Sequence, residues 1–377
     1  MRFPTSPRPR LAMTTVALCG ALALASCSDD PQAAATEDLD LGPLQLNEEQ
    51  EDELTSLYEA AIESGNTEVT IYAGHHDEFM DIYAAFEERF PGLAIATETY
   101  SGAELQTALE AERDTGRHVA GVISNPNADR YADQGFAEEY TPVTFELPDW
   151  TEGRIHQDQV QDPDGFYHSP WALFFSAGYN TEMLEESELP ANWPDFANPE
   201  WDGRVTFMTP ASPGGMQTVL TTLLQSGVVD EEWLRTVASQ SSLVAQDQLA
   251  LQSVSSGEYP IDLTSAATSI LNAAEEGAPL AVHFLEQPVI ATEKWMMAAE
   301  APAPETAKLL LNFLFTVEAQ QVTLESGNFP INQHESLESP HGWQRLEEYD
   351  FVPLPSQSVM REEMAGYADL FEEVTSQ

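Results

Sequence analysis

The chain has 377 residues, of which 64 are acidic and only 14 are basic. A charge of this size repels phosphate backbones and anionic membrane surfaces at long range, and no basic stretch compensates for it, so nucleic acid is excluded as a partner. We expect a salty habitat, in which short screening lengths relieve the self-repulsion and carboxylates keep the surface hydrated. The length indicates two lobes or domains.

The first 26 residues have the pattern of a secretory signal peptide. Arg2, Arg8 and Arg10 precede an uncharged run over residues 11–25, which is too short to span a bilayer as a permanent helix. The run ends in the letters LASC, which resemble a bacterial lipobox and make Cys27 the lipidated first residue of the mature chain. The alternative is an ordinary cleaved signal with an incidental cysteine. We therefore expect an extracytoplasmic protein that lipid on Cys27 anchors to the cell membrane.

The mature chain is expected to fold without a disulfide, because the only other cysteine, Cys19, lies inside the signal. A chain of this length buries enough apolar surface to be stable without one. Residues 27–47 are rich in Ala, Asp, Glu, Pro and Gln, which predicts a flexible acidic tether. The folded body therefore begins near residue 48.

Residues 48–66 predict a helix with an apolar stripe and a glycine at its end. These positions are Leu54, Leu57, Tyr58, Ile62 and Gly65. The letters EVTIYAGHHDEF then open a βαβ pattern, in which a β-rich run leads through a tight turn into a helix that ends before Pro91. A second helix and the letters HVAGVIS continue the alternation. The pattern predicts an α/β fold with mostly parallel sheets flanked by helices.

A central stretch, GFYHSPWALFFSAGYNTEML, is interpreted as containing the crossing between the lobes. Beyond it, the letters GRVTFMTPASPGGMQTVLTTLLQSG predict a strand, a glycine-bearing loop and a helix, and VSSGEYPIDLTSAATSILNAAEEG repeats that order. A last helical section covers residues 303–327, with Ala307, Leu310, Leu311 and Leu314 at helical spacing. No repeat of fixed period argues for a solenoid or propeller.

Four segments resemble ABC-importer solute-binding proteins, specifically the group similar to ferric-ion-binding proteins. They are YAGHHDEFMDIYAAFEERFPG, WPDFANPEWDGRVTFMTPASPGG, SGEYPI and APETAKLLLNFLFTVEAQQVTLESGNFPI, in the family's order between about residues 68 and 332. The resemblance implies a two-lobed fold of the type II periplasmic-binding-protein kind, with the ligand cleft between the lobes. Such a protein closes on a small solute about a hinge and delivers it to a permease and ATPase complex.

The expected organisation follows from this resemblance. We expect a monomer that needs no cofactor and has the following parts: signal peptide 1–26, tether 27–47, N-terminal helix 48–66, first lobe 67–165 and 280–335, second lobe 166–279, and a C-terminal helical segment 336–377 that packs on the lobes.

The solute is expected beyond the carboxyl ends of the strands, where loops lead into helix N-termini. Backbone N–H groups and partial positive charge there can hold an anionic group without lysine or arginine. The same residue types also cap helices and form turns, and this interpretation stays open for each position. The candidate ligand-binding residues in these loops are His75, His76, Ser101, Gly102, Ser124, Asn125, Thr209, Ser212, Gly214, Gly215, Thr264 and Ser265.

The pair His75-His76 raises the question of a metal, because imidazole and the carboxylates that follow are both good ligands for iron or zinc. The resemblance places His76 at the histidine of the ferric group. The family's tyrosine pair falls here on Ala267 and Thr268, however, and its glutamate loop on residues 124–126. An oxyanion or organic solute, with a ferric complex among the possibilities, is therefore the leading hypothesis, and ferric-ion binding with His76 as a ligand is the alternative. For both histidines, a polar cap on an acidic helix is the other interpretation.

Trp171 lies near the expected crossing, where its ring could cover a solute or pack as core. No enzyme is expected, because the sequence has no G-x-S-x-G, H-E-x-x-H or G-x-x-x-x-G-K motif and the mature chain has no free thiol nucleophile. Close pairs of carboxylates arise from this composition alone and do not indicate a glycosidase. A sensory binding protein that presents its solute to a receptor is a further alternative, which the sequence does not separate from transport.

Overall fold

The computed structural model describes residues 39–376 except 101, 213 and 333. Two predicted functional residues, Cys27 and Ser101, lie outside the described residues. Within the described part of the chain, no helix combines the length and apolar character needed to cross a membrane.

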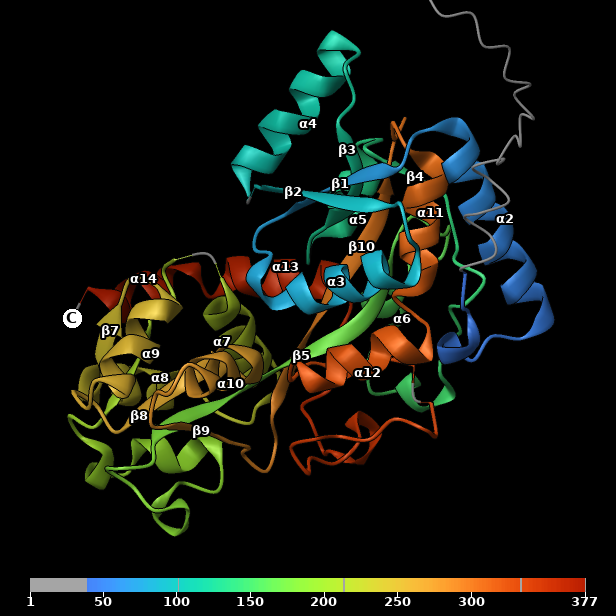
Figure 1. Cartoon of the computed structure of the whole chain (residues 1–377). Helices are drawn as coiled ribbons and strands as arrows, with labels where there is room; N and C mark the ends of the chain where they lie inside the picture. Colours follow the sequence, from blue (N-terminus) through green and yellow to red (C-terminus); the bar gives the residue numbers. More distant parts are fainter. Residues whose placement is uncertain (1–38, 101, 213, 333, 377) are drawn as a thin grey trace, which may run out of the picture.

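The predicted N-terminal helix is confirmed as α2 (Glu48–Ser64). Its start is fixed by a capping box, in which the Asn47 side chain accepts from the Gln50 amide and the Gln50 side chain accepts from the Asn47 amide. Its end is fixed by Gly65, which has a φ of 75° that favours glycine. The buried face of α2 packs beside α11 (Pro304–Phe313) on the outside of the first lobe (Figure 1).

One mixed sheet runs through the molecule (Figure 1). Its main path has the order β2-β1-β3-β10-β5-β8-β6-β7, while β4 pairs with β10, and β9 and β11 pair with β5. The strands are β1 (Glu68–Ala73), β2 (Ala94–Thr99), β3 (Ala120–Ser124), β4 (Ala137–Glu138), β5 (His168–Asn180), β6 (Val205–Met208), β7 (Ser242–Val244), β8 (Ile261–Ala266), β9 (Leu280–His283), β10 (Val289–Ala298) and β11 (Phe329–Pro330).

The two ends of this sheet are parallel and its centre is antiparallel. In the first lobe β1 pairs in parallel with β2 and β3, and in the second lobe β6 pairs in parallel with β7 and β8. Between them, β5 and β10 are antiparallel to each other and to their outer neighbours β8 and β3. The predicted parallel sheet of each lobe is thus confirmed, but the two sheets join into one through the central antiparallel pair.

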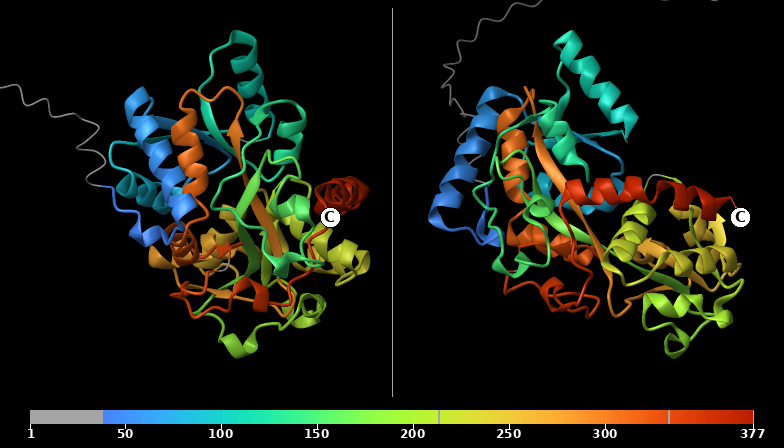
Figure 2. Two further views of the ribbon diagram at one scale, coloured as in Figure 1. Left: turned by 90° about the vertical axis from the view of Figure 1, so that its right-hand side faces the viewer. Right: turned by 180° about the vertical axis from the view of Figure 1, so that it is seen from behind.

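The crossing between the lobes lies on β5 and β10, as Figures 1 and 2 show. Phe174 belongs to the apolar core of the first lobe, and its neighbour Phe175 belongs to the core of the second. On β10 the same change falls between Val289 and Ile290. The central stretch that was expected to contain the crossing therefore does contain it.

Helices cover both lobes, in the alternating order that the sequence predicts. The first lobe carries α3 (Met80–Arg89), α4 (Ala103–Thr115), α5 (Ala128–Asp133), α6 (Gln157–Val160), α11 and α12 (Val317–Glu325). The second lobe carries α7 (Gly215–Ser226), α8 (Glu231–Gln240), α9 (Asp247–Ser255) and α10 (Ala267–Glu275). Short 3-10 helices are η1 (Gly42–Leu44), η2 (Asp77–Phe79), η3 (Asp149–Thr151), η4 (Glu186–Glu188), η5 (Trp193–Ala197), η6 (Pro199–Trp201) and η7 (Leu346–Glu348).

The last helical section, expected as one piece, is divided into α11 and α12. The division has a local cause, because Thr316 is an N-cap whose side chain accepts from the Ala319 amide. Hydroxyl capping starts a new helix at Val317 although the apolar spacing continues through Leu314. The periodicity identified the buried face correctly but did not show the break.

The C-terminal helices contact both lobes. In the second lobe, α13 (Gln357–Gly366) packs on α7 and α14 (Ala368–Thr375) packs on α8, and both lie beside that lobe in Figure 2. Arg361 of α13 forms an ion pair with Asp129 on α5 of the first lobe.

The small strand β9 bears on where the second lobe ends. It pairs with residues 177–180 of β5, in the second-lobe half of that strand. A lobe bound after residue 283 fits this pairing better than the predicted bound after residue 279. The other predicted bounds stay predictions.

Candidate solute-binding site between the lobes

A cavity of about 250 Å³ lies between the two lobes, against β5. Loops that follow β1, β6, β7 and β8 surround it, so it lies where strand ends meet helix starts, as ligand sites of open α/β sheets do. Its lining residues are His75, Glu78, Leu173, Phe175, Gly215, Asp247, Gln248, Leu251, Ser265, Ala266 and Ser269.

Larger hollows exist on the surface, but their position argues against a binding role. One of about 600 Å³ is lined by residues 147–149, 151–157, 225 and 353–355, and another of about 680 Å³ lies along the start of α2. Neither is lined by the loops that follow the parallel strands. The cavity between the lobes is therefore the candidate site.

The first-lobe wall of the cavity comes from the loop after β1 and from η2. This turn presents His75 and Glu78, whose Nε2 and Oε2 atoms are 3.6 Å apart. The His75 ring lies 5.0 Å from the ring of Phe79. Glu78 Oε1 accepts a hydrogen bond of 3.3 Å from Ser269 Oγ on α10. The two lobes therefore meet directly at the edge of the cavity.

His76 points away from the cavity and into the first lobe. It is 8% exposed, and its ring nitrogens lie 3.1 Å from the Tyr83 hydroxyl and 3.0 Å from the Glu98 carbonyl oxygen. Both nitrogens thus have protein partners, and the described residues contain no group of three or more His, Cys, Asp and Glu side chains that could hold a metal ion. This arrangement does not support the predicted metal role of His76.

The other predicted first-lobe residues in the described part serve the fold. Ser124 is fully buried and donates a hydrogen bond of 2.5 Å to Glu293 on β10. Asn125 Oδ1 accepts from the Asn127 amide at 2.9 Å, which is a turn contact. Gly102 precedes α4 with a φ of 50°. None of these three lines the cavity, so the capping and turn interpretation fits Asn125 and Gly102 better, and Ser124 joins two strands.

Trp171 is a core residue. It is fully buried, and its ring centre lies 5.3 Å from that of Phe79 and 5.5 Å from that of Trp295. Because side chains alternate along a strand, Leu173 and Phe175 lie on the same face of β5 as Trp171. These two line the cavity, so the packed core gives way to cavity wall along this face.

Among the predicted second-lobe residues, Gly215 is the one whose residue type the structure explains most clearly. It begins α7, and a Cβ atom at this position would lie 2.6 Å from Cε1 of Phe175. Only glycine therefore lets the helix N-terminus approach the ring in the cavity wall. Ser265 also lines the cavity, with its hydroxyl donating to the buried Asp262 carboxylate.

Three more predicted second-lobe residues, Thr209, Ser212 and Gly214, do not line the cavity. Thr209 Oγ1 lies 2.6 Å from Thr375 Oγ1 of α14, and Ser212 donates its amide to the Thr209 carbonyl at 3.2 Å. Gly214 precedes α7. Thr264 lies within β8, one residue before Ser265. The loop between β6 and α7 therefore contacts the C-terminal helix α14 through Thr209 and does not line the cavity through Thr209, Ser212 or Gly214.

Sequence reasoning missed several lining residues, and Asp247 is the most informative of them. It begins α9, and burial raises the pKa of its carboxyl to about 6. Among 64 acidic residues nothing in the sequence distinguishes it, although its place after a β-rich run is a usable signal. Glu78, Leu173, Phe175, Gln248, Leu251, Ala266 and Ser269 are the other lining residues that were missed.

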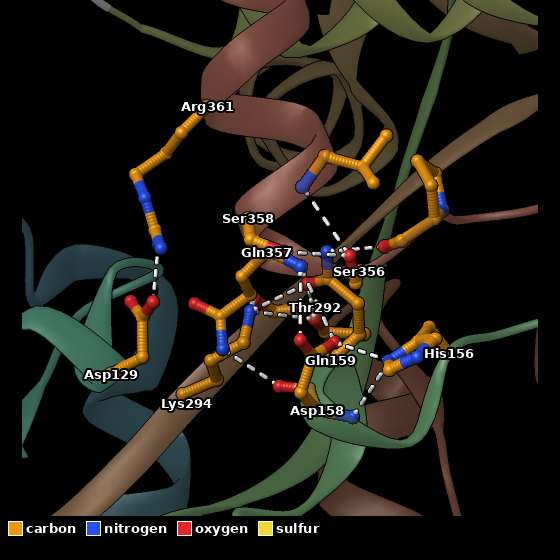
Figure 3. A network of polar contacts seen from close by, with 12 residues as sticks. Asp129, His156, Asp158, Gln159, Thr292, Lys294, Ser356, Gln357, Ser358 and Arg361 are labelled. Atoms are coloured by element: carbon orange, nitrogen blue, oxygen red, sulfur yellow. Dashed lines mark hydrogen bonds and ion pairs between the residues drawn. The ribbon is translucent and has the colours of Figure 1, made fainter.

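Two buried charges lie next to each other on β10 and face opposite sides. Burial raises the pKa of Glu293, while His75 and the bond from Ser124 lower it in part. Lys294 lies in the network of Figure 3, where Nζ donates to Gln159 Oε1 at 2.9 Å and to Thr292 Oγ1 at 3.0 Å. Burial lowers the pKa of this lysine to about 8.

The network on the Lys294 side joins the C-terminal helix to the first lobe. Gln357 Nε2 donates to the Asp158 carbonyl at 2.7 Å and to the Tyr167 hydroxyl at 2.6 Å. Figure 3 shows Arg361 reaching Asp129 from the same helix. This side of the central strands is thus filled by the protein's own side chains.

Comparison with known proteins gives the class that this fold and cavity define. The family model described as "Bacterial extracellular solute-binding protein" matches residues 81–349, and the chain belongs to this family. Members are extracytoplasmic components of ABC-type transport that bind small solutes and work with a permease and an ATPase. They are not enzymes, which confirms the prediction made for this chain.

Curated relatives and solved structures confirm the resemblance to the ferric-ion-binding group. The major ferric iron-binding protein of Neisseria gonorrhoeae is 21% identical over 279 residues, which cover 71% of this chain and 82% of the relative. Iron-bound HitA from Pseudomonas aeruginosa superimposes with a TM-score of 0.63 at 18% identity, covering 82% of this chain and 99% of that one.

The structural neighbours include proteins whose solutes differ. AfuA from Actinobacillus pleuropneumoniae, solved with fructose-6-phosphate, superimposes with a TM-score of 0.60 at 16% identity, covering 81% of this chain and 98% of that one. A substrate-binding protein of an ABC transporter from Agrobacterium tumefaciens has a TM-score of 0.65 at 12% identity, covering 81% and 96%. At these identities the likeness establishes the two-lobed fold, and the solute has to be argued from the cavity itself.

Proposed function

We propose that the protein captures a small solute in the cavity between its lobes by hinge closure and delivers it to an ABC permease, while lipid on Cys27 holds it at the outer side of the membrane. The observation that carries the proposal is a cavity lined from both lobes, at whose edge Ser269 of one lobe donates to Glu78 of the other. A solute that contacts both walls favours the closed form by its difference in affinity between states.

Closure is tested by small-angle scattering of the protein with and without a solute that binds. We expect the radius of gyration to fall on binding, because the lobes approach around β5 and β10. Identical scattering curves with a solute of proven affinity would refute hinge closure.

The place of binding is tested with a matched pair of glycine variants. Gly215→Val adds carbon atoms where a Cβ already lies 2.6 Å from Phe175, so we expect it to weaken binding more than folding. Gly366→Val is the control, because a Cβ at Gly366 has no heavy atom within 4 Å. Equal affinity in the two variants would remove the start of α7 from the site.

The anchor is tested separately. We expect labelled fatty acid to be incorporated into the native chain and not into Cys27→Ala, which should appear in the soluble extracytoplasmic fraction. An unlabelled native chain would exclude the lipid anchor and leave solute binding intact.

The salty habitat is tested by measuring unfolding from low to molar salt. We expect the stability of the protein to rise with salt.

Ferric-ion uptake is the second candidate function, and the relatives' names favour it. At the positions of the family's tyrosine pair, Ala267 and Thr268 are both 1% exposed and offer no phenolate. Titration with ferric citrate tests this candidate, because a raised melting temperature and iron that stays with the protein through gel filtration are expected only if iron binds.

A sensory role is a third candidate, in which the closed form contacts a receptor instead of a permease. Neighbouring genes separate the two roles. A permease and an ATPase favour import, whereas a sensor kinase alone favours signalling.

A further inference from the structure

The wall of the cavity between the lobes carries negative charge. Its charged side chains are Glu78 and Asp247, its other titratable side chain is His75, and its described lining contains neither lysine nor arginine. Charges act more strongly as water leaves a closing cleft, since the effective dielectric constant falls. Such a wall repels an anionic solute and attracts a cationic one.

Both carboxylates are partly buried and keep oxygens without a hydrogen-bond partner among the described residues, although Glu78 Oε1 accepts from Ser269. Glu78 Oε2 is buried and accepts no hydrogen bond from the described residues, and His75 Nε2 lies 3.6 Å away. Asp247 has no ion pair and no side-chain hydrogen bond with the described residues, and burial alone raises its pKa. A carboxylate that is partly removed from water loses solvation, and a cation supplied by the solute offsets that loss.

The two carboxylates belong to different lobes. Glu78 lies on η2 of the first lobe and Asp247 on α9 of the second. Both line the same cavity, so they repel each other, and a cation between them turns this repulsion into attraction. The same pair of charges therefore links recognition of the solute to closure.

The rest of the wall fits an organic molecule better than a metal ion. Leu173, Phe175 and Leu251 form an apolar side, and aromatic rings attract cations to their faces. The described residues contain no group of three or more His, Cys, Asp and Glu side chains that could hold a metal ion. A volume of about 250 Å³ equals that of about eight water molecules in the liquid, which limits the solute to a small molecule.

From the paired walls of this cavity we infer that the solute is a small organic cation, an amine or quaternary ammonium ion, bound with its positive group between Glu78 and Asp247 and its apolar part against Phe175. The inference rests on the proposed function and names its solute class. It departs from the oxyanion that the loop positions alone suggested.

Calorimetric titration of the purified protein tests the inference. The probes are choline and putrescine, the neutral carbon isostere of choline, and succinate and glycerol phosphate as anions of similar size. We expect saturable binding for an ammonium probe, and none for the isostere or the anions. Glu78→Gln and Asp247→Asn should each weaken binding of that probe by about tenfold or more.

The matched control is Asp77→Asn, which removes the same charge from the exposed neighbour of Glu78. We expect it to change affinity by less than about twofold, because an exposed charge is screened by salt. A loss equal to that of Glu78→Gln would show that net charge alone acts, and would overturn the inferred contact.

The outcomes separate this inference from the proposed function. An anion or neutral solute that compacts the protein, with affinity unchanged or raised in Glu78→Gln, would overturn the inferred charge and leave hinge closure standing. An ammonium probe that binds without any change in scattering would overturn closure and leave the solute class standing. Failure of both ammonium probes to bind folded protein counts against the inference.

Discussion

The two faces of the central strands treat buried charge in opposite ways. On one face, Lys294 has oxygen acceptors from Gln159 and Thr292 within 3.3 Å, and the C-terminal helix covers the network. On the other face, Glu78 Oε2 and Asp247 have no such hydrogen bonds among the described residues, and a cavity lies beside them. Charge that the protein satisfies itself serves the structure, and we propose that charge left unsatisfied beside this cavity serves a ligand.

The largest effect is expected at Trp171, and it tests whether this residue belongs to the core or to the cavity wall. Trp171→Ala removes a fully buried ring from contact with Phe79 and Trp295, so it should lower the free energy of unfolding by about 3–5 kcal/mol. Denaturant titration measures the loss. Trp171→Phe should keep solute affinity, and a selective loss of binding in this milder variant would make Trp171 part of the site.

The next effect concerns Lys294 on the opposite face. The pKa of Lys294 in the folded state, about 8, lies below its value in the unfolded state. Below pH 8 both states hold the proton, so the folded state bears the full cost of burying the charged ammonium group. As pH rises from about 8 to 10.5 the folded state loses its proton first, and stability should rise by about 2–3 kcal/mol relative to Lys294→Met. Lys308→Met, at the other lysine, is the control and should keep this rise.

The third variant should raise the free energy of unfolding, whereas substitutions that remove contacts lower it. Asp247→Asn removes an unpaired carboxylate, so the ligand-free protein should gain about 1–2 kcal/mol at neutral pH. Because the folded pKa of Asp247 is raised to about 6, native stability should fall as pH rises from about 4 to 6, and the variant should lack this part of the fall. Thermal unfolding across this range measures it. Destabilisation of the variant at neutral pH would indicate a structural partner.

The smallest effect concerns the ion pair between α13 and the first lobe. Arg361 is half-exposed, so Arg361→Ala should lower stability by less than about 1 kcal/mol and leave solute affinity unchanged. Denaturant titration at low and high salt measures the loss, which should shrink with salt. A change in affinity would mean that the C-terminal helix takes part in closure.

Local patterns in the sequence were sufficient for most helices and strands of each lobe. The βα alternation, the helical stripes and the crossing on β5 all follow from apolar spacing and from turn residues, which act over short distances along the chain. The joining of two sheets into one was not predictable in the same way. It depends on antiparallel pairing of Phe175 with Val289, residues that are far apart in the sequence.

The site was predicted in part, and the reason lies in side-chain direction. Of the predicted residues, His75, Gly215 and Ser265 line the cavity. His76 is adjacent to His75 but turns into the core, because successive residues after a strand face different sides. Asp247 and Glu78 were missed because burial and contacts, which need coordinates, are what mainly set them apart from the other acids.

The placement of β10 has a consequence for the order in which the chain can fold. Ser124 of the first lobe bonds to Glu293, and the core beneath it includes Leu309 and Leu310 of α11. The first half of that lobe therefore has no finished interior until most of the polypeptide exists. Contacts at such long sequence separation form slowly, so a growing chain stays incomplete, and open to handling by other factors, through nearly all of its synthesis.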